Sequence, residues 1–293
     1  MTEPERITLD AGKYQRDERP RVLRTFDDIR ALLAPAYSPT VADQRPLFLD
    51  ISQYDDIDLD VVANFNSPKI WGVFVRIGGS AAVKDTKFST YWPWAKRAGL
   101  LRQIYTYNWP GWAVSLHIQN FMLCVEDWCE GDLGDGPIII DAECHADKTR
   151  KQVSDHTIGY AQALIAETGK SVEIYSGDWF IRGYMEFQDW MKTYKWWLAT
   201  WMYPDQPFEH PGPPTVTQGI PKENVKWHQT GSNCRADIFG GTTSDRIDTD
   251  RWNLSLQSFY DEYGIQQPQP PNGDLETRVE ALENWARGLA FNE

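Results

Sequence analysis

Short apolar segments alternate with helical segments from Pro46 onward, and this alternation is the feature that most limits the folds open to the chain. The apolar segments are rich in β-branched and aromatic side chains, which is typical of strands buried on both faces. Strands separated by helices indicate parallel βα units. We predict strands over residues 47–50, 71–77, 101–107, 137–141, 172–175, 197–201, 225–229 and 246–248.

Helices are predicted only between the earlier strands. They cover residues 91–98, 116–128 and 153–167. Because the last strands follow one another without helices, the pattern predicts an α/β barrel that finishes irregularly. In barrels of parallel strands the site forms at the carboxyl ends of the strands. Asp50, Asp141 and Asp248 all fall at such ends, so we expect a site there.

The fourth strand ends in two carboxylates. Three isoleucines at 138–140 are followed by Asp141, and Glu143 comes two residues later. Because residues i and i+2 point to the same face of a strand, we expect the two acids to lie side by side. Crowding separates the pKa values of two acids, so that one holds a proton while the other stays charged. Glycoside cleavage requires this division of roles.

The other acids have a structural explanation as well. An aspartate at the end of a strand often only caps a turn or a helix, and this alternative applies to Asp50 and Asp248 when each is taken singly. We expect Asp250 to be a capping or solvent-exposed residue rather than part of the site.

Net charge excludes some classes of partner. The formal charge of −13 argues against a nucleic-acid or anionic-membrane partner, since both require a basic surface. No apolar run approaches the ~18 residues of a membrane span, so we expect no membrane insertion. Residues 1–20 are charged and lack the apolar region of a secretory signal peptide. We therefore expect the protein to stay inside the producing cell or to leave it by a route that needs no signal.

The composition divides the chain into four parts. We interpret residues 1–45 as a polar N-terminal arm, 46–264 as the barrel, 265–273 as a Pro/Gln-rich linker and 274–293 as a C-terminal amphipathic helix. The apolar residues of this last helix follow the 4-3-4-3 spacing of a coiled-coil seam, over about two heptads. A helix this short is marginal in isolation, so it docks on the barrel, self-associates or is a frayed tail.

The four cysteines show no zinc-type spacing, and we expect free or packing thiols. Cys144 directly follows Glu143, which leaves a thiol nucleophile as a minor alternative. The nearby base would be His145, but adjacent residues of a strand point in opposite directions.

An ordered set of short motifs resembles one known family. In chain order they are Leu49-Asp50-Ile51-Ser52, Asp85-Thr86-Lys87-Phe88, Ala95 with Ala98-Gly99-Leu100, Pro137 to Glu143, Thr168-Gly169 with Ile174-Tyr175-Ser176, Trp197-Leu198-Ala199, Trp227 with Gln229, and Ile247-Asp248-Thr249-Asp250. Each motif is weak alone, but the ordered set is strong over about residues 46–260. The chain resembles the glycoside hydrolase family 25 lysozymes that are common in phages and bacteria.

The resemblance implies a shortened, irregular TIM-like β/α barrel of the (β/α)5(β)3 type. It also implies N-acetylmuramidase activity, which cuts the β-1,4 bond between N-acetylmuramic acid and N-acetylglucosamine in peptidoglycan, without a metal or other cofactor. Glu143 matches the general acid/base of the family, Asp141 its partner carboxylate, and Asp50 and Asp248 two further acids of the floor. Asp141 would either attack the anomeric carbon or orient the 2-acetamido group of the substrate, and both routes stay open with a preference for the second.

Aromatic residues supply candidates for contact with the flat faces of sugars, because the chain has 14 Trp and 13 Tyr. The candidates are Tyr107, Trp109, Trp112, Tyr175 and Trp201. Core packing explains each of them equally well. Gln229, in the motif with Trp227, is a further candidate for substrate binding.

Three departures from the family pattern concern the subsites. The segment after the second strand reads Ile77-Gly78-Gly79-Ser80, so the glutamate common there is absent. The third strand reads Tyr105-Thr106-Tyr107 and lacks the usual histidine, and Asp55 stands where an amide is common. We expect these changes to alter the preference for glycan or stem peptide rather than the acid machinery.

Two hypotheses of function follow. The first is a phage-encoded peptidoglycan muramidase, either an endolysin that reaches the wall after holin-type release or an enzyme carried on a virion or injection device. In the second case the C-terminal helix would form a homo-oligomer or attach to the virion. The alternative is a non-catalytic cell-wall glycan-binding module, which the altered segment at Gly78 and Gly79 favours and the intact Asp141 and Glu143 disfavour.

Overall fold

The computed structural model describes residues 45–66, 68–80, 83–200, 219–242 and 246–266. The chain divides into two units, residues 1–42 and 43–293, and all described residues lie in the second. The predicted N-terminal arm, the C-terminal helix, Trp201 and nearly all of the predicted linker lie outside the described residues.

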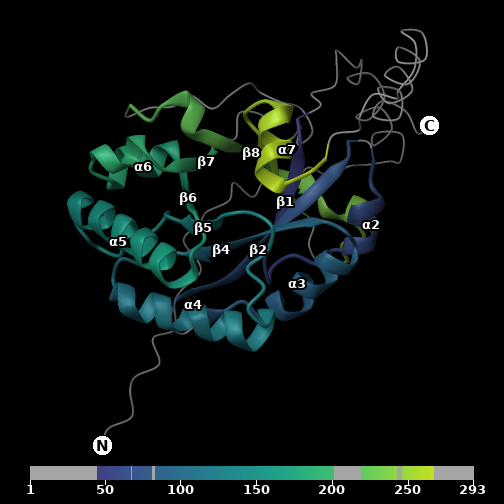
Figure 1. The fold of residues 1–293 in the computed structure, drawn as a ribbon, viewed down its shortest axis with the longest axis horizontal. Coiled ribbons are helices and arrows are strands. Elements are labelled where there is room, and N and C mark those ends of the chain that lie inside the picture. Colours follow the sequence, from purple (N-terminus) through teal and green to yellow (C-terminus); the bar gives the residue numbers. More distant parts are fainter. Residues whose placement is uncertain (1–44, 67, 81–82, 201–218, 243–245, 267–293) are drawn as a thin grey trace, which may run out of the picture. The chain divides into compact units, whose positions relative to one another are not determined.

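Eight strands of the described residues close into a barrel (Figure 1). Around the ring they are β1 (Leu47–Ile51), β9 (Arg246–Trp252), β8 (Val225–Arg235), β7 (Lys195–Ala199), β6 (Val172–Gly177), β5 (Ile138–Asp141), β4 (Leu101–Tyr107) and β2 (Ile70–Ser80). Pairing between β1 and β2 completes the ring. This arrangement confirms the predicted mixed α/β barrel.

The strands are parallel over most of the barrel, and the last strand departs from this pattern, as the sequence predicts. The pairs from β1 through β2, β4, β5, β6 and β7 to β8 are parallel, whereas β9 is antiparallel to both of its neighbours. The short strand β3 (Val83–Lys84) pairs only with the end of β2. Gly78 and Gly79, which we expected to follow the second strand, are therefore part of β2.

The helices that precede β9 lie outside the ring and connect successive strands (Figure 1). They are α2 (Leu59–Asn64), α3 (Phe88–Arg97), α4 (Val114–Cys129), α5 (Arg150–Thr168) and α6 (Asp178–Tyr184), together with the short 3-10 helices η1 (Asp189–Lys192), η2 (Lys222–Asn224) and η3 (Ala236–Phe239). Helix α7 (Leu256–Tyr263) follows β9. The structure has α3, α4 and α5 where the sequence predicts them. The sequence analysis missed α2, α6 and α7, which have at most eight residues each. None of the helices in the described part of the chain is long and apolar enough to cross a membrane.

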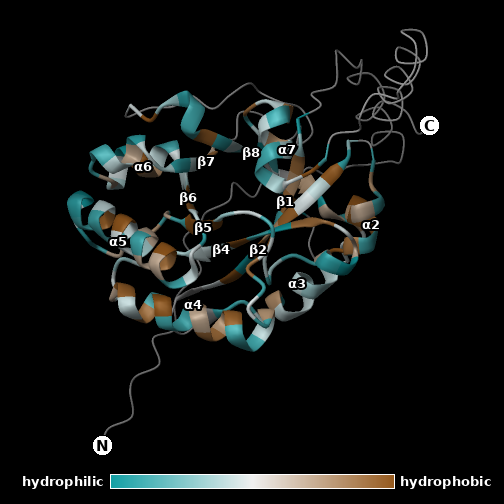
Figure 2. Ribbon diagram, viewed as in Figure 1, coloured by the Kyte–Doolittle hydropathy of each residue, from teal (hydrophilic) through white to brown (hydrophobic). Residues whose placement is uncertain are grey.

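The core has two layers because alternate residues of each strand point to opposite faces. Aliphatic side chains such as Leu49, Val73 and Ile140 fill the space between strands and helices. The interior of the barrel is mainly aromatic, and Phe74 stacks on Trp197 with ring centroids 4.3 Å apart. Colouring by hydropathy shows hydrophobic strands at the centre and mixed helices around them (Figure 2). Many of the 14 tryptophans are therefore packing residues.

Helix α7 closes the barrel at the end where the parallel strands begin. Trp252, the last residue of β9, donates its backbone N–H to Pro46 before β1, so α7 starts at that end. Phe259 is fully buried, with its ring centroid 5.5–6.3 Å from those of Phe48, Trp71, Trp227 and Trp252. The aromatic interior thus continues into this helix.

Replacing Phe259 by alanine should lower the free energy of unfolding by about 3–5 kcal/mol, because a buried aromatic ring leaves a cavity. Urea denaturation followed by tryptophan fluorescence would measure the loss. The matched control is Gln257→Ala on the exposed side of α7, which should change stability little. Equal stability of Phe259→Ala and wild type would show that α7 does not close the barrel.

Candidate active site

Four acids predicted from the sequence gather where the parallel strands end. Asp50 on β1 pairs directly with Asp248 on β9, and Asp141 is the last residue of β5. Burial raises the pKa of Tyr175 on β6, and the charges of Glu143, Asp141, Asp248 and Asp50 raise it further, so all four acids lie near its hydroxyl. The structure therefore brings Asp50, Asp141, Glu143 and Asp248 to the same end of the barrel, which we call the mouth.

Asp141 and Glu143 form a coupled pair. Strand β5 ends at Asp141, so Glu143 lies in the following loop rather than on the strand as predicted. Burial raises the pKa of Asp141, the charge of Glu143 raises it further, and Arg76 opposes the rise. Oδ1 of Asp141 is buried and has no hydrogen-bond partner among the described residues. Because the charge of Glu143 raises the pKa of Asp141, the two acids titrate as a pair.

Glu143 is suited to hold a proton near neutral pH. Burial raises its pKa to about 7, and a hydrogen bond from the backbone N–H of Gly177 limits the rise. A Cβ at Gly177 would lie 3.1 Å from Oε1 of Glu143 and 2.4 Å from Nε1 of Trp179. A side chain at this position would therefore have to displace Trp179 and would crowd the carboxyl of Glu143.

Hydrogen bonds connect Asp50 to the wall of the mouth. Nε2 of Gln229 donates to Oδ2 of Asp50 over 3.4 Å, and Oε1 of Gln229 accepts from the hydroxyl of Tyr175 over 2.9 Å. Burial and the charge of Asp248 raise the pKa of Asp50, while a hydrogen bond from Tyr105 lowers it. Gln229 is thus an internal partner of the acids, buried beside them.

The prediction that Asp250 caps a turn or faces solvent was wrong. Its side chain is fully buried, and Oδ1 accepts a hydrogen bond from Nε1 of Trp197 over 2.9 Å. Burial and the charges of Asp50 and Asp248 raise the pKa of Asp250 well above its usual value. It is a fifth acid beneath the mouth. The i, i+2 spacing from Asp248 could have indicated this, since both residues share one face of β9.

Arg76 is a cation beside the acids that the sequence analysis missed. Its Nε donates to Oδ2 of the buried Asp85 over 3.0 Å, and its charge opposes the rise in pKa of both Asp141 and Asp55. The sequence could have indicated this, because Arg76 comes two positions after Phe74 and so shares the inward face of an apolar strand.

The aromatic candidates separate into rim and core. Tyr107 at the end of β4 is half-buried, as are Trp109 and Trp112 in the loop that follows. Tyr175 is buried in the barrel interior and reaches the site only through its hydroxyl. Trp201 lies outside the described residues. Trp179, at the start of α6, was missed, although half of it is exposed beside Gly177 and Glu143 (50%).

The cysteines are free, as expected. Burial raises the pKa of Cys144, whose thiol is hydrogen-bonded to Tyr107, so the reactive thiolate is disfavoured and the nucleophile alternative is not supported. Among the described residues, no group of three or more His, Cys, Asp or Glu side chains is arranged to hold a metal ion.

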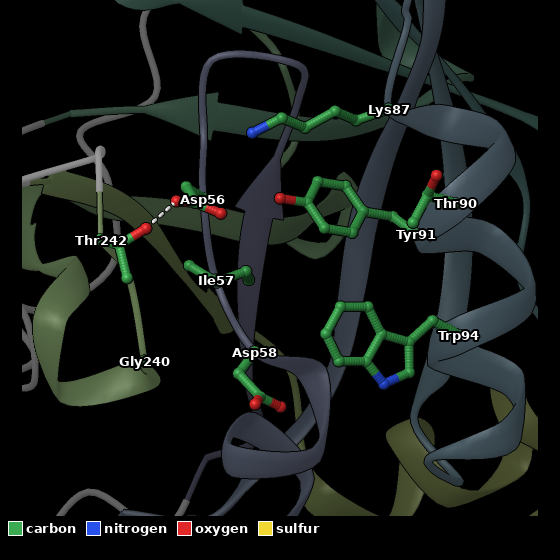
Figure 3. A pocket seen from close by; sticks show the side chains of 9 residues that line it. All are labelled: Asp56, Ile57, Asp58, Lys87, Thr90, Tyr91, Trp94, Gly240 and Thr242. Carbon is green, nitrogen blue, oxygen red and sulfur yellow. Dashed lines mark hydrogen bonds between the residues drawn. The ribbon is translucent and has the colours of Figure 1, made fainter.

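A pocket of about 390 Å³ lies beside the loop after β1 (Figure 3). It is lined by Asp56, Ile57, Asp58, Lys87, Thr90, Tyr91, Trp94, Gly240 and Thr242, so none of the four acids borders it. Lys87 and Tyr91 both donate to the backbone oxygen of Asp55, and Thr242 donates to Asp56. These polar groups support the loop that carries Asp55 next to Asp50.

Comparison with family models gives a match to glycosyl hydrolases family 25 over residues 49–229, more than half of the chain. The chain belongs to glycosyl hydrolase family 25. The match contains Asp50, Asp141, Glu143 and Gln229 and ends before β9, which carries Asp248.

Solved structures share the family 25 fold. A bacterial lysozyme from Streptomyces coelicolor matches with a TM-score of 0.60 and 18% identity, covering 76% of this chain and 99% of that chain. A family 25 glycosyl hydrolase from Bacillus anthracis matches with a TM-score of 0.57 and 16% identity, covering 75% of this chain and 95% of that chain. At such low identities the likeness shows the fold alone.

Curated relatives include the uncharacterized protein YegX of Escherichia coli, 27% identical over 154 residues. The match covers 52% of this chain and 54% of YegX, so the chain spans about half the length of the relatives it matches.

Replacing Asp250 by asparagine should stabilise this family 25 protein at pH 8 and change it little at pH 4. Because the folded-state pKa of Asp250 is raised, protonation stabilises the fold at low pH, and that contribution is lost as the pH rises. Asparagine does not ionise, so it removes this loss of folding stability, which is about 1.4 kcal/mol for each unit by which the pKa is raised. Urea unfolding at both pH values measures it, with the exposed Asp261→Asn as control. Equal destabilisation at both pH values would contradict this assignment.

Proposed function

We propose that the protein is a peptidoglycan muramidase that cleaves the β-1,4 bond between N-acetylmuramic acid and N-acetylglucosamine. The observation that carries the proposal is the coupled Asp141–Glu143 pair at the mouth, in which burial raises the pKa of Glu143 to about 7. Membership of family 25 and the lysozyme fold support the same reaction class.

In this proposal Glu143 donates its proton to the glycosidic oxygen as the bond to the anomeric carbon breaks. This route requires an ionised Asp141. Burial raises the pKa of Asp141, whereas the charge of Arg76 and the neutral, protonated state of Glu143 both favour the ionised form. The unpartnered Oδ1 of Asp141 is available to accept the N–H of the substrate 2-acetamido group, whose carbonyl oxygen then bonds to the anomeric carbon. In the second step, water that is deprotonated by Glu143 attacks the anomeric carbon and breaks its bond to the acetamido oxygen. Direct attack by Asp141 is the competing route.

The surrounding residues would bind and shape the glycan. Asp50, Asp248 and Gln229 form the polar floor, and Tyr107 and Trp109 offer aromatic faces at the rim. Trp179 adds an exposed indole beside Glu143. Stacking by Tyr175 is limited by its burial, and the role of Trp201 stays a prediction.

The biological setting is also proposed. An endolysin that reaches the wall after release, or an enzyme mounted on a virion, would both meet peptidoglycan as substrate. Endolysins are among the solved structures that share this fold, so the fold is compatible with this setting. A non-catalytic glycan-binding module is the alternative, and it would not need a proton-holding carboxyl at the mouth.

Glu143→Gln should abolish the clearing of purified cell walls, with a rate loss of at least about 100-fold, because an amide cannot donate the proton. Turbidity and reducing-end analysis measure this and identify the bond that is cut. Glu130→Gln, at an exposed position after α4, is the matched control and should remain active. A wild type that binds walls without clearing them would support the binding-module alternative.

The activity should fall above pH 7, because Glu143 must be protonated and its pKa is about 7. The protonated fraction drops about tenfold for each further pH unit, so kcat/KM at pH 9 should be about 100-fold below its maximum. A pH profile on a soluble glycan measures this. A flat profile from pH 6 to 9 would exclude Glu143 as the general acid.

A further inference from the structure

Two histidines behind the mouth are not used by the proposed reaction. His117 on α4 is buried, and His156 on α5 is half-buried. Their rings lie 5.4 Å apart in an edge-to-face arrangement. Burial lowers the pKa of both histidines, so the rings are neutral at neutral pH.

Each histidine binds a backbone carbonyl of the loop after β4. Nε2 of His117 lies 3.0 Å from the oxygen of Trp109, and Nε2 of His156 lies 2.8 Å from the oxygen of Trp112. Because a carbonyl oxygen only accepts, each neutral ring must carry its proton on Nε2 and donate it. Residues 109–112, which we call the Trp109 loop, are thus tied to two helices.

Asn108 connects the same hydrogen-bond network to β5, the strand that ends in Asp141. Its backbone N–H donates to the backbone oxygen of Asp141 over 2.9 Å. Its side-chain amide lies 2.8 Å from Nδ1 of His156 and 3.0 Å from Oγ1 of Thr157. Nδ2 of Asn108 donates to Oγ1 of Thr157, whose own hydroxyl proton goes to the backbone oxygen of Val153. The side chain of Asn108 is thus held against α5.

The Trp109 loop lies next to the loop after β5, which carries Glu143. Tyr107 pairs with Asp141 across β4 and β5, and the ring of Trp109 lies 6.4 Å from that of Tyr107. A Cβ at Gly111 would lie 2.6 Å from Nε1 of Trp109 and 3.4 Å from the Cβ of Ala146. The indole therefore packs on its own loop, close to the segment that follows Glu143.

We propose that His117 and His156 are positioning residues that hold the Trp109 loop in place for a sugar ring of the glycan. This inference rests on the proposed function for its substrate class. Neither histidine touches the reacting atoms. Through the carbonyls of Trp109 and Trp112 they fix the backbone on both sides of Gly111, so that the indole is ordered before the glycan binds.

The decisive comparison is His156→Leu with His156→Gln. Leucine keeps the apolar contacts but removes both hydrogen bonds, whereas glutamine can still donate to the oxygen of Trp112. We expect His156→Leu to raise KM for a soluble peptidoglycan glycan about tenfold with kcat changed less than about twofold, and His156→Gln to restore most of the affinity. His117→Leu and His117→Gln should behave in the same way.

A second measurement does not depend on activity. Hydrogen exchange at the amides of residues 108–113 should accelerate in His156→Leu and return towards wild type in His156→Gln. The control is Leu164→Ala, a buried position further along α5, which should lower stability without raising KM.

Each outcome then has one meaning. A wild-type KM and wild-type exchange in His156→Leu would overturn the inference while the muramidase proposal stands. An equal rise of KM in Leu164→Ala would also overturn it, because general destabilisation would explain the effect. If the wild type cleaves no wall glycan, the proposed function fails and the substrate role of the Trp109 loop fails with it.

Discussion

Burial of several carboxylates at one end of the barrel is the constraint on which the rest of the structure depends. An ionised carboxyl away from water is costly unless charges or hydrogen bonds stabilise it. The structure supplies such partners from four different strands or loops: Gln229 for Asp50, Trp197 for Asp250, the backbone of Gly177 for Glu143, and the charge of Arg76 for Asp141. These partners offset only part of the cost of burying the charges, so the pKa values of the acids stay raised. A raised pKa allows a carboxyl to hold a proton near neutral pH.

Local pattern was sufficient to predict the elements that carry the acids. The isoleucines at 138–140 favour a buried strand, and that strand ends at Asp141, the first of the two acids. The same reasoning from i to i+2 places Asp250 with Asp248 on the inward face of β9. We applied that spacing to Asp141 and Glu143 but not to Asp248 and Asp250, and the burial of Asp250 was therefore missed.

Features that depend on contacts between distant segments could not be predicted. The pairing of Asp50 with Asp248 joins residues at opposite ends of the barrel sequence, and no local signal fixes it. Arg76 became part of the site only because β2 lies beside β1 and β4. Helix α7 is short, and its place follows from the aromatic surface that it covers rather than from its own helix propensity.

The antiparallel course of β9 has a consequence for how this barrel can be attached to other structures. It returns the chain to the end where β1 begins, and Arg251 there donates to the backbone oxygen of Arg45 over 3.0 Å. Ile265, just after α7, packs against the interior aromatic cluster at that same end. The described barrel therefore receives and releases its chain on the side away from the acids. The points at which any further segment joins residues 45–266 therefore lie at the end of the barrel opposite the mouth.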